Sequence, residues 1–154
     1  MKDKGIFMNI NEILKKEFNL KDEQIKDAYF IGGNQKISDS VVSQVNGITS
    51  NDVSKNRIEG ERRKDTNAKV IEEFYSNSQL DGVIVAKDLE LVDALTVGPL
   101  AAKKNIPVVI ATDELSKSQE DILNKKKSPK IYETGGGIKS SVVDKLKQLL
   151  NNRK

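Results

Sequence analysis

The sequence predicts an α/β protein with a parallel sheet and helices on both faces, as in Rossmann-like and flavodoxin-like units. Short apolar runs alternate along the chain with longer segments whose apolar residues recur at helical spacing. Such alternation is typical of parallel strands joined by helices. In addition, GGNQKISDSVV at 32–42 returns as GGGIKSSVV at 135–143, each time after an apolar run. The chain therefore contains a unit of strand, glycine turn and helix twice.

The first elements are expected before residue 50. Residues 5–8 fit a short strand, and a helix with Asn11 as its N-cap is expected to run to about residue 19. The apolar run 28–31 predicts a buried strand that ends at Gly32 and Gly33.

The helix after each glycine turn has its own start signals. Ser38 can cap the first helix, whose inner face would be made of valines, whereas the equivalent position in the second copy is Lys139, a poor cap. Both copies can form the same hydrophobic staple, by Ile37 with Val42 and by Ile138 with Val143. The architecture is therefore repeated, but a site made of side chains is not.

The remaining elements follow from the same patterns. We expect a helix that begins at Asp65 with Phe74 and Tyr75 inward, a central strand at 82–86, and a helical segment 91–105 broken near Gly98. Its small residues, Gly98 included, would let it approach the sheet closely. Beyond it we expect a strand at 107–111, a helix at 114–124, a strand at 130–132 and a helix at 138–150.

The composition limits the possible functions. The chain has 154 residues, of which 36% are hydrophobic and 32% charged, as is typical of a soluble globular protein. It has no cysteine and no histidine, which excludes disulfides, a Ser-His-Asp triad and the usual zinc sites. A net charge of +3 favours anionic partners only weakly and does not indicate nucleic acid. No run approaches the roughly 20 apolar residues of a membrane span, and the start does not fit a secretory signal.

The glycine turns are the first candidate binding elements. Gly32 and Gly33, and Gly135 and Gly136, follow strands and could present backbone N–H groups to an anion. Alternatively, they could only supply positive φ at tight turns. A full G-x-G-x-x-G and a P-loop lysine are both missing, so dinucleotide binding is not expected, and we predict no cofactor.

A cluster of cations is the second candidate. Arg62, Arg63 and Lys64 precede a predicted helix start, where each exposed cation opposes the helix dipole by about 0.3–1 kcal/mol. The cluster is easier to explain if it faces an anionic ligand or an internal carboxylate, although a solvated basic loop is the alternative. Asp93, beyond the strand at 82–86, could orient Arg63 or accept ligand hydroxyls, or it could simply cap a helix.

These stretches carry a resemblance to a known family. RIEGERRKDTNAKVIEE, VIVAKDLELVDALTVGPLAAKKNIPVVIATDE and KIYETGGGIKSSVVDKL resemble, over residues 57–150, the type 2 cell-wall-binding repeat of clostridial surface-layer and cell-wall proteins. The stretch from Asp93 to Lys103 matches the family's D-A-L-[ST]-x-G-P-L-A-A-K pattern almost letter for letter. The family's R-I-x-G-x-x-R pattern is matched by Arg57, Ile58, Gly60 and Arg63, while Lys64 replaces its usual aromatic residue.

The resemblance implies a domain organisation. Residues 1–56 would be the second half of one repeat, and residues 57–154 would be the next repeat, without its last strand. Members usually carry three such repeats arranged as a pseudo-trimer, so other copies of the repeat are expected partners. They typically carry a signal peptide, so its absence suggests an excised fragment of an extracellular protein of the cell wall or S-layer.

The resemblance also implies a function. The chain would be a non-catalytic module that holds a surface protein, without covalent attachment, to an anionic secondary polysaccharide of the Gram-positive wall. Arg62, Arg63 and Lys64 would pair with its phosphodiesters. Two alternatives stay open. One is a small Rossmann-like hydrolase or phosphotransferase that uses Asp93 and Asp113 with a divalent metal, and the other is a purely structural oligomerisation domain.

Overall fold

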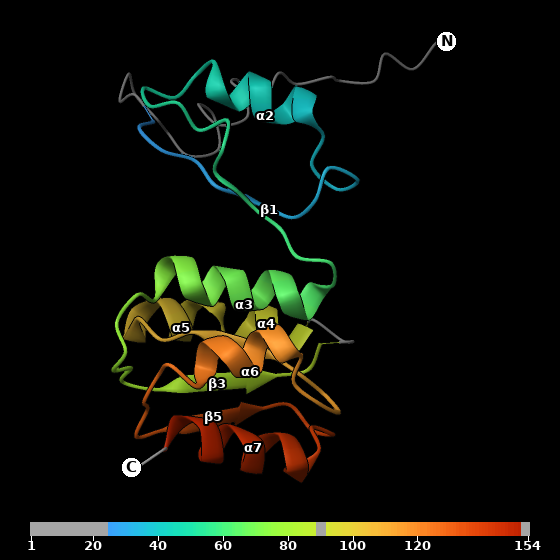
Figure 1. Cartoon of the computed structure of the whole chain (residues 1–154), viewed down its shortest axis with the longest axis vertical. Coiled ribbons are helices and arrows are strands. Elements are labelled where there is room, and N and C mark those ends of the chain that lie inside the picture. The colour runs from blue at the N-terminus through green and yellow to red at the C-terminus, as the bar shows by residue number, and fades with distance from the viewer. Residues whose placement is uncertain (1–24, 89–91, 152–154) are drawn as a thin grey trace. The chain divides into compact units, whose positions relative to one another are not determined.

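The structure, a computed structural model, describes residues 25–88 and 92–151 (Figure 1). The strand expected at 5–8 and the helix expected at 11–19 lie outside the described residues. The chain divides into two compact units, Met1–Ile58 and Glu59–Lys154.

The first unit contains β1 (Phe30–Ile31), α2 (Asp39–Asn46) and β2 (Arg57–Ile58). The two strands pair in parallel, with Phe30 opposite Arg57 and Ile31 opposite Ile58. The backbone N–H of Val41 donates to the Ser38 hydroxyl at 3.4 Å, so Ser38 caps α2 as the sequence predicts. Parallel pairing needs a crossover, and α2 supplies it.

The core of the first unit is small. Phe30, Val42 and Val53 form its buried cluster in the described part, Ile37 packs against them, and Ile58 of β2 is buried as well. The expectation that β1 is buried throughout is wrong, because Tyr29 is 45% exposed and Ile31 is 47% exposed. Successive side chains of a strand point to opposite faces, and only Phe30 points to the valines of α2.

The second unit is built on a parallel sheet with the strand order β4-β3-β5. Its strands are β3 (Val83–Ala86), β4 (Val108–Ile110) and β5 (Ile131–Thr134). Its helices are α3 (Arg63–Phe74), α4 (Val92–Thr96), α5 (Gly98–Lys104), α6 (Lys117–Leu123) and α7 (Ser140–Leu150). The predicted α/β class, the parallel sheet and the central place of β3 are confirmed.

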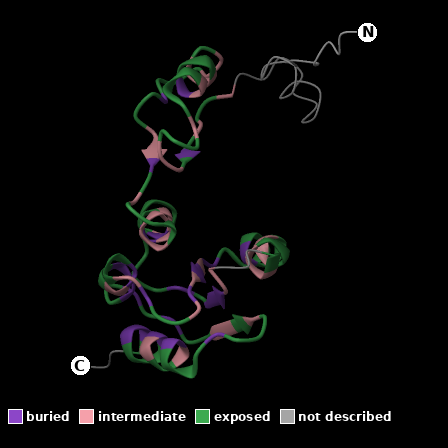
Figure 2. Cartoon of the chain, turned by 90° about the vertical axis from the view of Figure 1, so that its right-hand side faces the viewer, coloured by how far each residue is buried: buried purple, intermediate pink, exposed green. Residues whose placement is uncertain are grey.

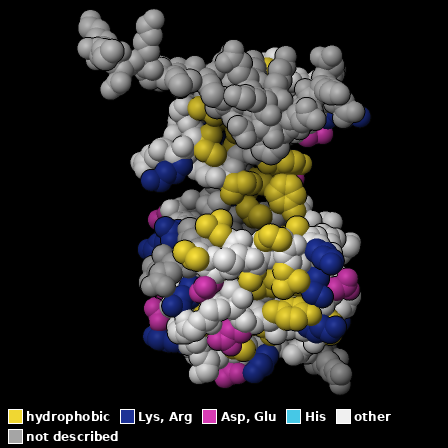
Figure 3. Space-filling view, turned by 180° about the vertical axis from the view of Figure 1, so that it is seen from behind, with side chains coloured by type: hydrophobic (Ala, Val, Ile, Leu, Met, Phe, Trp, Pro, Cys, Tyr) yellow, Lys and Arg dark blue, Asp and Glu magenta, His cyan; other side chains and the backbone are white. Residues whose placement is uncertain are grey.

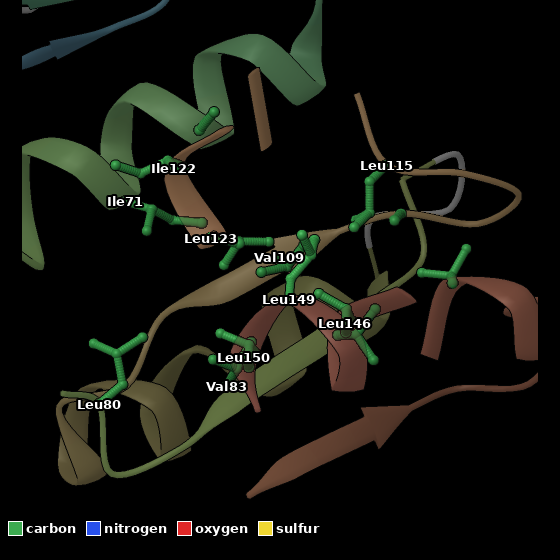
Figure 4. Close-up of a cluster of buried hydrophobic side chains, with 14 of the residues drawn as sticks. Ile71, Leu80, Val83, Val109, Leu115, Ile122, Leu123, Leu146, Leu149 and Leu150 are labelled. Carbon is green, nitrogen blue, oxygen red and sulfur yellow. The ribbon is translucent and has the colours of Figure 1, made fainter. Parts of the chain in front are cut away.

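Helices cover both faces of this sheet. On one face, Val83 and Val85 of β3 pack with buried residues of α3, α6 and α7 (Figure 4). On the other face, Ile84 packs with Ala101 of α5 and with Ile106. Because successive residues of β3 pack into hydrophobic clusters on opposite faces of the sheet, the whole strand is buried (Figure 2). This explains why the sequence of β3 is apolar without interruption.

Several helix boundaries differ from the predicted ones. The N-cap of α3 is Arg62, and Asp65 lies in the first turn, where its carboxylate accepts the Arg62 N–H at 3.2 Å. The helix expected from Glu114 begins only at Lys117, because the Ser116 hydroxyl accepts the N–H of Gln119 and fixes the start there. As expected of a lysine, Lys139 precedes α7 without a side-chain cap.

The helical segment breaks where the sequence predicts. α4 ends at Thr96 and α5 begins at Gly98. Ala101 is buried against the sheet, but a Cβ on Gly98 would meet nothing within 4 Å, so the expected close approach at Gly98 is wrong. Phe74, expected inward, is exposed, whereas the Tyr75 hydroxyl reaches inward and donates to the Ile106 carbonyl at 3.1 Å.

The outer edge of β4 is filled by side chains from α3 and α6. The Asn67 amide donates to the Val108 carbonyl at 2.8 Å, and its oxygen accepts the Ile110 N–H at 3.2 Å. The amide of Gln119, which is fully buried, donates to the Ile110 carbonyl at 3.0 Å and to the Asn67 oxygen at 2.9 Å. Backbone groups that another strand would use are therefore already bonded.

No helix among the described residues is long and apolar enough to cross a bilayer.

Candidate functional site

A hollow of about 660 Å³ lies in the second unit where chain segments leave the carboxyl ends of β3 and β4. It is lined by Glu61, Arg62, Arg63, Lys64, Asp65, Asp88, Glu114, Leu115, Ser116 and Lys117. In a parallel α/β sheet, ligands bind outside the carboxyl ends of the strands. The fold thus brings all three predicted cations to the place where a ligand site is expected.

Lys64 is held by internal partners. Its ammonium donates to the Glu114 carbonyl at 2.7 Å and lies 3.4 Å from the Asp88 carboxylate. The side chains of Lys64 and Asp88 are only 19% and 13% exposed. Lys64 therefore links α3 to the segments that follow β3 and β4, which is the internal pairing that the sequence left open.

Asp88 is the centre of this link. The Thr112 hydroxyl donates to the Asp88 carboxylate, and the Asp88 N–H donates to the Thr112 hydroxyl at 3.2 Å. Burial pulls the pKa of Asp88 upward, but the Thr112 hydrogen bond and the Lys64 ammonium outweigh it and hold the pKa below its ordinary value. The carboxylate thus stays charged and keeps its hold on Lys64. Sequence inspection missed Asp88, although it stands just after β3, where strand-end carboxylates are expected.

The two arginines are more exposed than Lys64. The Arg63 guanidinium donates through Nη1 to the backbone carbonyl of Asp88, which positions it at the hollow. A guanidinium has five N–H donors, so one such bond leaves most of its fork for a ligand. Arg62 occupies the N-cap position of α3 on the same rim.

Asp65 joins the starts of two helices. Hydrogen bonds from the hydroxyls of Ser118 and Ser116 lower the pKa of Asp65, and the N–H and charge of Arg62 act in the same direction. Because α3 and α6 are tied here, the rim formed by Arg62 and Arg63 has a fixed support.

The hollow is not basic as a whole. Its lining carries four cations, on Arg62, Arg63, Lys64 and Lys117, and four carboxylates, on Glu61, Asp65, Asp88 and Glu114. Lys64 is neutralised internally, and Lys117 pairs with Asp121. The positive charge available to a ligand is therefore mainly that of the two arginines.

Asp93 and the second glycine turn meet each other. Gly135 has φ +77°, and a Cβ there would lie 1.8 Å from Oδ2 of Asp93. Gly136 lacks a positive φ and would have open space around a Cβ. The turn therefore needs glycine at 135 for conformation and for close approach, which favours the conformational interpretation there. Asp93 faces this turn, whereas Arg63 donates to the Asp88 carbonyl.

The first glycine turn belongs to the first unit. Gly32 has φ +133°, and its carbonyl accepts a hydrogen bond from Arg57 Nη1 at 2.9 Å. Arg57 also pairs with Asp39 at 3.0 Å, while the Gly33 carbonyl accepts two N–H groups of the turn that follows. Gly32 and Gly33 therefore have structural roles within the first unit.

The aspartates on which the enzyme alternative rests contact other groups of the second unit. Among the described residues, no three His, Cys, Asp or Glu side chains are grouped so that they could hold a metal ion. Asp113 pairs with Lys139 at 3.0 Å, and Asp93 lies against Gly135.

Comparison with known proteins identifies similar domains. Residues 57–144 match the family described as cell wall binding domain 2 (CWB2). Among solved structures, Cwp6 from Clostridium difficile is 38% identical with a TM-score of 0.77, and Cwp8 from the same organism is 36% identical with a TM-score of 0.76. The matches cover 81% and 85% of this chain but only 20% of Cwp6 and 23% of Cwp8. No curated protein matches the chain significantly.

Proposed function

We propose, since this chain belongs to the cell wall binding domain 2 family, that its second unit binds an anionic polysaccharide of the cell wall through Arg62 and Arg63. A module of this family functions at the cell wall or cell surface. In our proposal the attachment is non-covalent and non-catalytic, the polymer is a secondary polysaccharide of a Gram-positive wall, and the module anchors a surface protein.

One observation carries the choice of residues. Of the three adjacent cations, Lys64 is bonded to Glu114 and Asp88, whereas Arg62 and Arg63 are exposed on the rim of the hollow. A guanidinium can contact a phosphodiester or carboxylate through two parallel hydrogen bonds, which gives geometry as well as charge. Because the lining beneath the two arginines is nearly neutral, the hollow would favour a polymer in which single anionic groups alternate with neutral sugars. A polymer with a continuous run of charge would fit it less well.

We propose that other copies of the repeat are partners, as in a pseudo-trimer. The described surface best suited to such contact is that of α4 and α5, where Val92, Leu95 and Leu100 are 67%, 75% and 42% exposed. Figure 3, seen from the side where these helices lie, shows hydrophobic side chains on the second unit beside lysine and arginine side chains. Exposed apolar groups of this kind are typical of protein contacts.

Binding of the chain to isolated anionic wall polymer tests the proposal. Binding should weaken steeply as salt is raised, because the Debye length shrinks to about 10 Å at 0.1 M salt and exposed ion pairs are screened. Arg63→Ala should weaken binding by roughly tenfold, the size of one charge-assisted hydrogen bond. Arg63→Lys should also weaken it, since an ammonium cannot make a two-pronged contact.

Two controls separate binding from folding. Lys125→Ala removes an exposed cation that is not among the residues of the hollow, and it should leave binding unchanged. The thermal stability of each Arg63 variant is measured in parallel, because Arg63 also bonds to the Asp88 carbonyl. Full binding by a stably folded Arg63→Ala chain would place the polymer elsewhere.

A further inference from the structure

β1 and β5 are equivalent strands in the two copies of the repeat. When the first glycine of each turn is superposed, Gly32 corresponds to Gly135 and Phe30 corresponds to Glu133. Both glycines have positive φ, and each strand is followed by a helix. A strand that pairs with β1 but has no equivalent beside β5 therefore indicates an element that could also pair with β5.

β1 has such a neighbour in β2. The N–H of Phe30 donates to the Asn56 carbonyl and the N–H of Gly32 donates to the Ile58 carbonyl, both at 2.9 Å. The side chain of Arg57 strengthens this pairing by its bond to the Gly32 carbonyl. One edge of β1 is thus occupied by the strand that reaches it after α2.

Among the described residues, no strand pairs with the equivalent edge of β5. The N–H of Val83 donates to the Lys130 carbonyl at 3.0 Å, so in this parallel pair the backbone groups of Tyr132 face β3. Those of Glu133, and the N–H of Gly135, face the other way. Within the described residues, no backbone hydrogen bond is made by the Gly135 N–H, and β5 has β3 as its one neighbouring strand. These outward groups are the counterparts of those by which β1 holds β2.

We propose that the outer edge of β5 is a docking site for the Arg-Ile strand of a further copy of the repeat. The family match begins at residue 57, yet Arg57 and Ile58 pair with β1, which lies before that match. The opening strand of one repeat is therefore built into the unit that precedes it. The same event at β5 would interlock the second unit with the next copy.

The surroundings of β5 suit this occupant. Ser140 stands where Asp39 stands in the first copy, so an incoming arginine could bond to the Gly135 carbonyl and to the Ser140 hydroxyl, as Arg57 bonds to the Gly32 carbonyl and Asp39. The opposite edge of the sheet offers no such place, because Asn67 fills the outer edge of β4. Of the two sheet edges formed by the described strands, the outer edge of β5 is thus the one that can accept a further strand.

The test is to extend the full chain by a second copy of its own residues 51–60, placed after Lys154. The added arginine then follows the end of α7 at Leu150 by the same interval that separates Arg57 from the end of α2 at Asn46. Hydrogen exchange at the Glu133 and Gly135 amides should slow by at least about tenfold in the extended chain. The melting temperature of the second unit should rise by about 5 °C.

A matched control has the same extension with Ile58→Pro in the added copy. Proline removes the N–H that Ile58 would donate to β5, so exchange and melting should return to those of the unextended chain. Equal exchange at Glu133 in the unextended chain and the extended chain would overturn the proposal. Equal protection by the proline extension would overturn it too, because the protection would then not come from strand pairing.

Discussion

Replacing Asn67 with alanine should open the outer edge of β4 and destabilise the second unit. Its side chain makes three hydrogen bonds, to the Val108 carbonyl, the Ile110 N–H and the Gln119 amide, at 2.8, 3.2 and 2.9 Å. Each contributes about 1 kcal/mol net, and more where a buried partner is left unsatisfied. Alanine regains up to about 0.7 kcal/mol as a better helix former.

The expected loss in the free energy of unfolding is therefore about 2–3 kcal/mol. For a unit of this size, such a loss lowers the melting temperature by roughly 10–20 °C. Gln119 limits the damage, because its buried amide keeps the Ile110 carbonyl as a partner at 3.0 Å.

Urea unfolding followed by far-ultraviolet circular dichroism measures the change. Glu73→Ala is the matched control, because Glu73 is an exposed residue of the same helix and the substitution also ends in alanine. The midpoint of Asn67→Ala should fall clearly below that of Glu73→Ala, with a similar slope. Coincident unfolding curves would mean that the side chains at this edge add nothing to stability, and the reasoning would be wrong.

Three further predictions concern single groups in the second unit. Lys126→Met should lower the free energy of unfolding by about 1–3 kcal/mol, because the buried Lys126 ammonium donates to three backbone carbonyls at and after the end of α3, which would lose their partner. Urea unfolding measures the change, and an unchanged midpoint contradicts the prediction. Gly135→Ala should destabilise the unit by at least about 1–2 kcal/mol, since φ is +77° and Asp93 crowds the site, whereas Gly136→Ala should be nearly neutral; similar melting of the two variants refutes the steric argument. The pKa of Asp88 is lower folded than unfolded, so its contribution is present above the unfolded value and is lost as the pH falls through the folded one. The stability difference between the parent chain and Asp88→Asn should therefore shrink as the pH falls below about 4, and a difference that does not depend on pH would exclude this role.

The fold could be predicted because its signals are local. The unbroken apolar run of β3, the serine before α2 and the glycine-proline pair that starts α5 each report a strand, a cap or a break through neighbouring residues. The exposure of Tyr29 and Ile31 could not be predicted, because it depends on which face of β1 receives a helix. The start of α6 lies later along the chain than predicted, because Ser116 and not an earlier residue caps the helix.

The candidate site was predicted in part. The sequence placed Arg62, Arg63 and Lys64 in one candidate cluster, in which Arg63 alone matches the family's arginine, and it did not show which of the three have internal partners. The partners of Lys64 lie far along the chain, at Asp88 and Glu114, and only the packing of α3 against the ends of β3 and β4 brings them together. Long-range partners decide which cations remain for a ligand.

The two units have cores of very different size, with consequences for any experiment on the whole chain. Phe30, Val42, Val53 and Ile58 are the buried hydrophobic side chains of the first unit's described part, so local opening should cost less free energy there than in the second unit. A protease should therefore cut the first unit sooner. The chain contains no tryptophan and three tyrosines, of which only Tyr29 precedes residue 59. Intrinsic fluorescence of a Tyr29→Phe variant would thus follow the second unit alone.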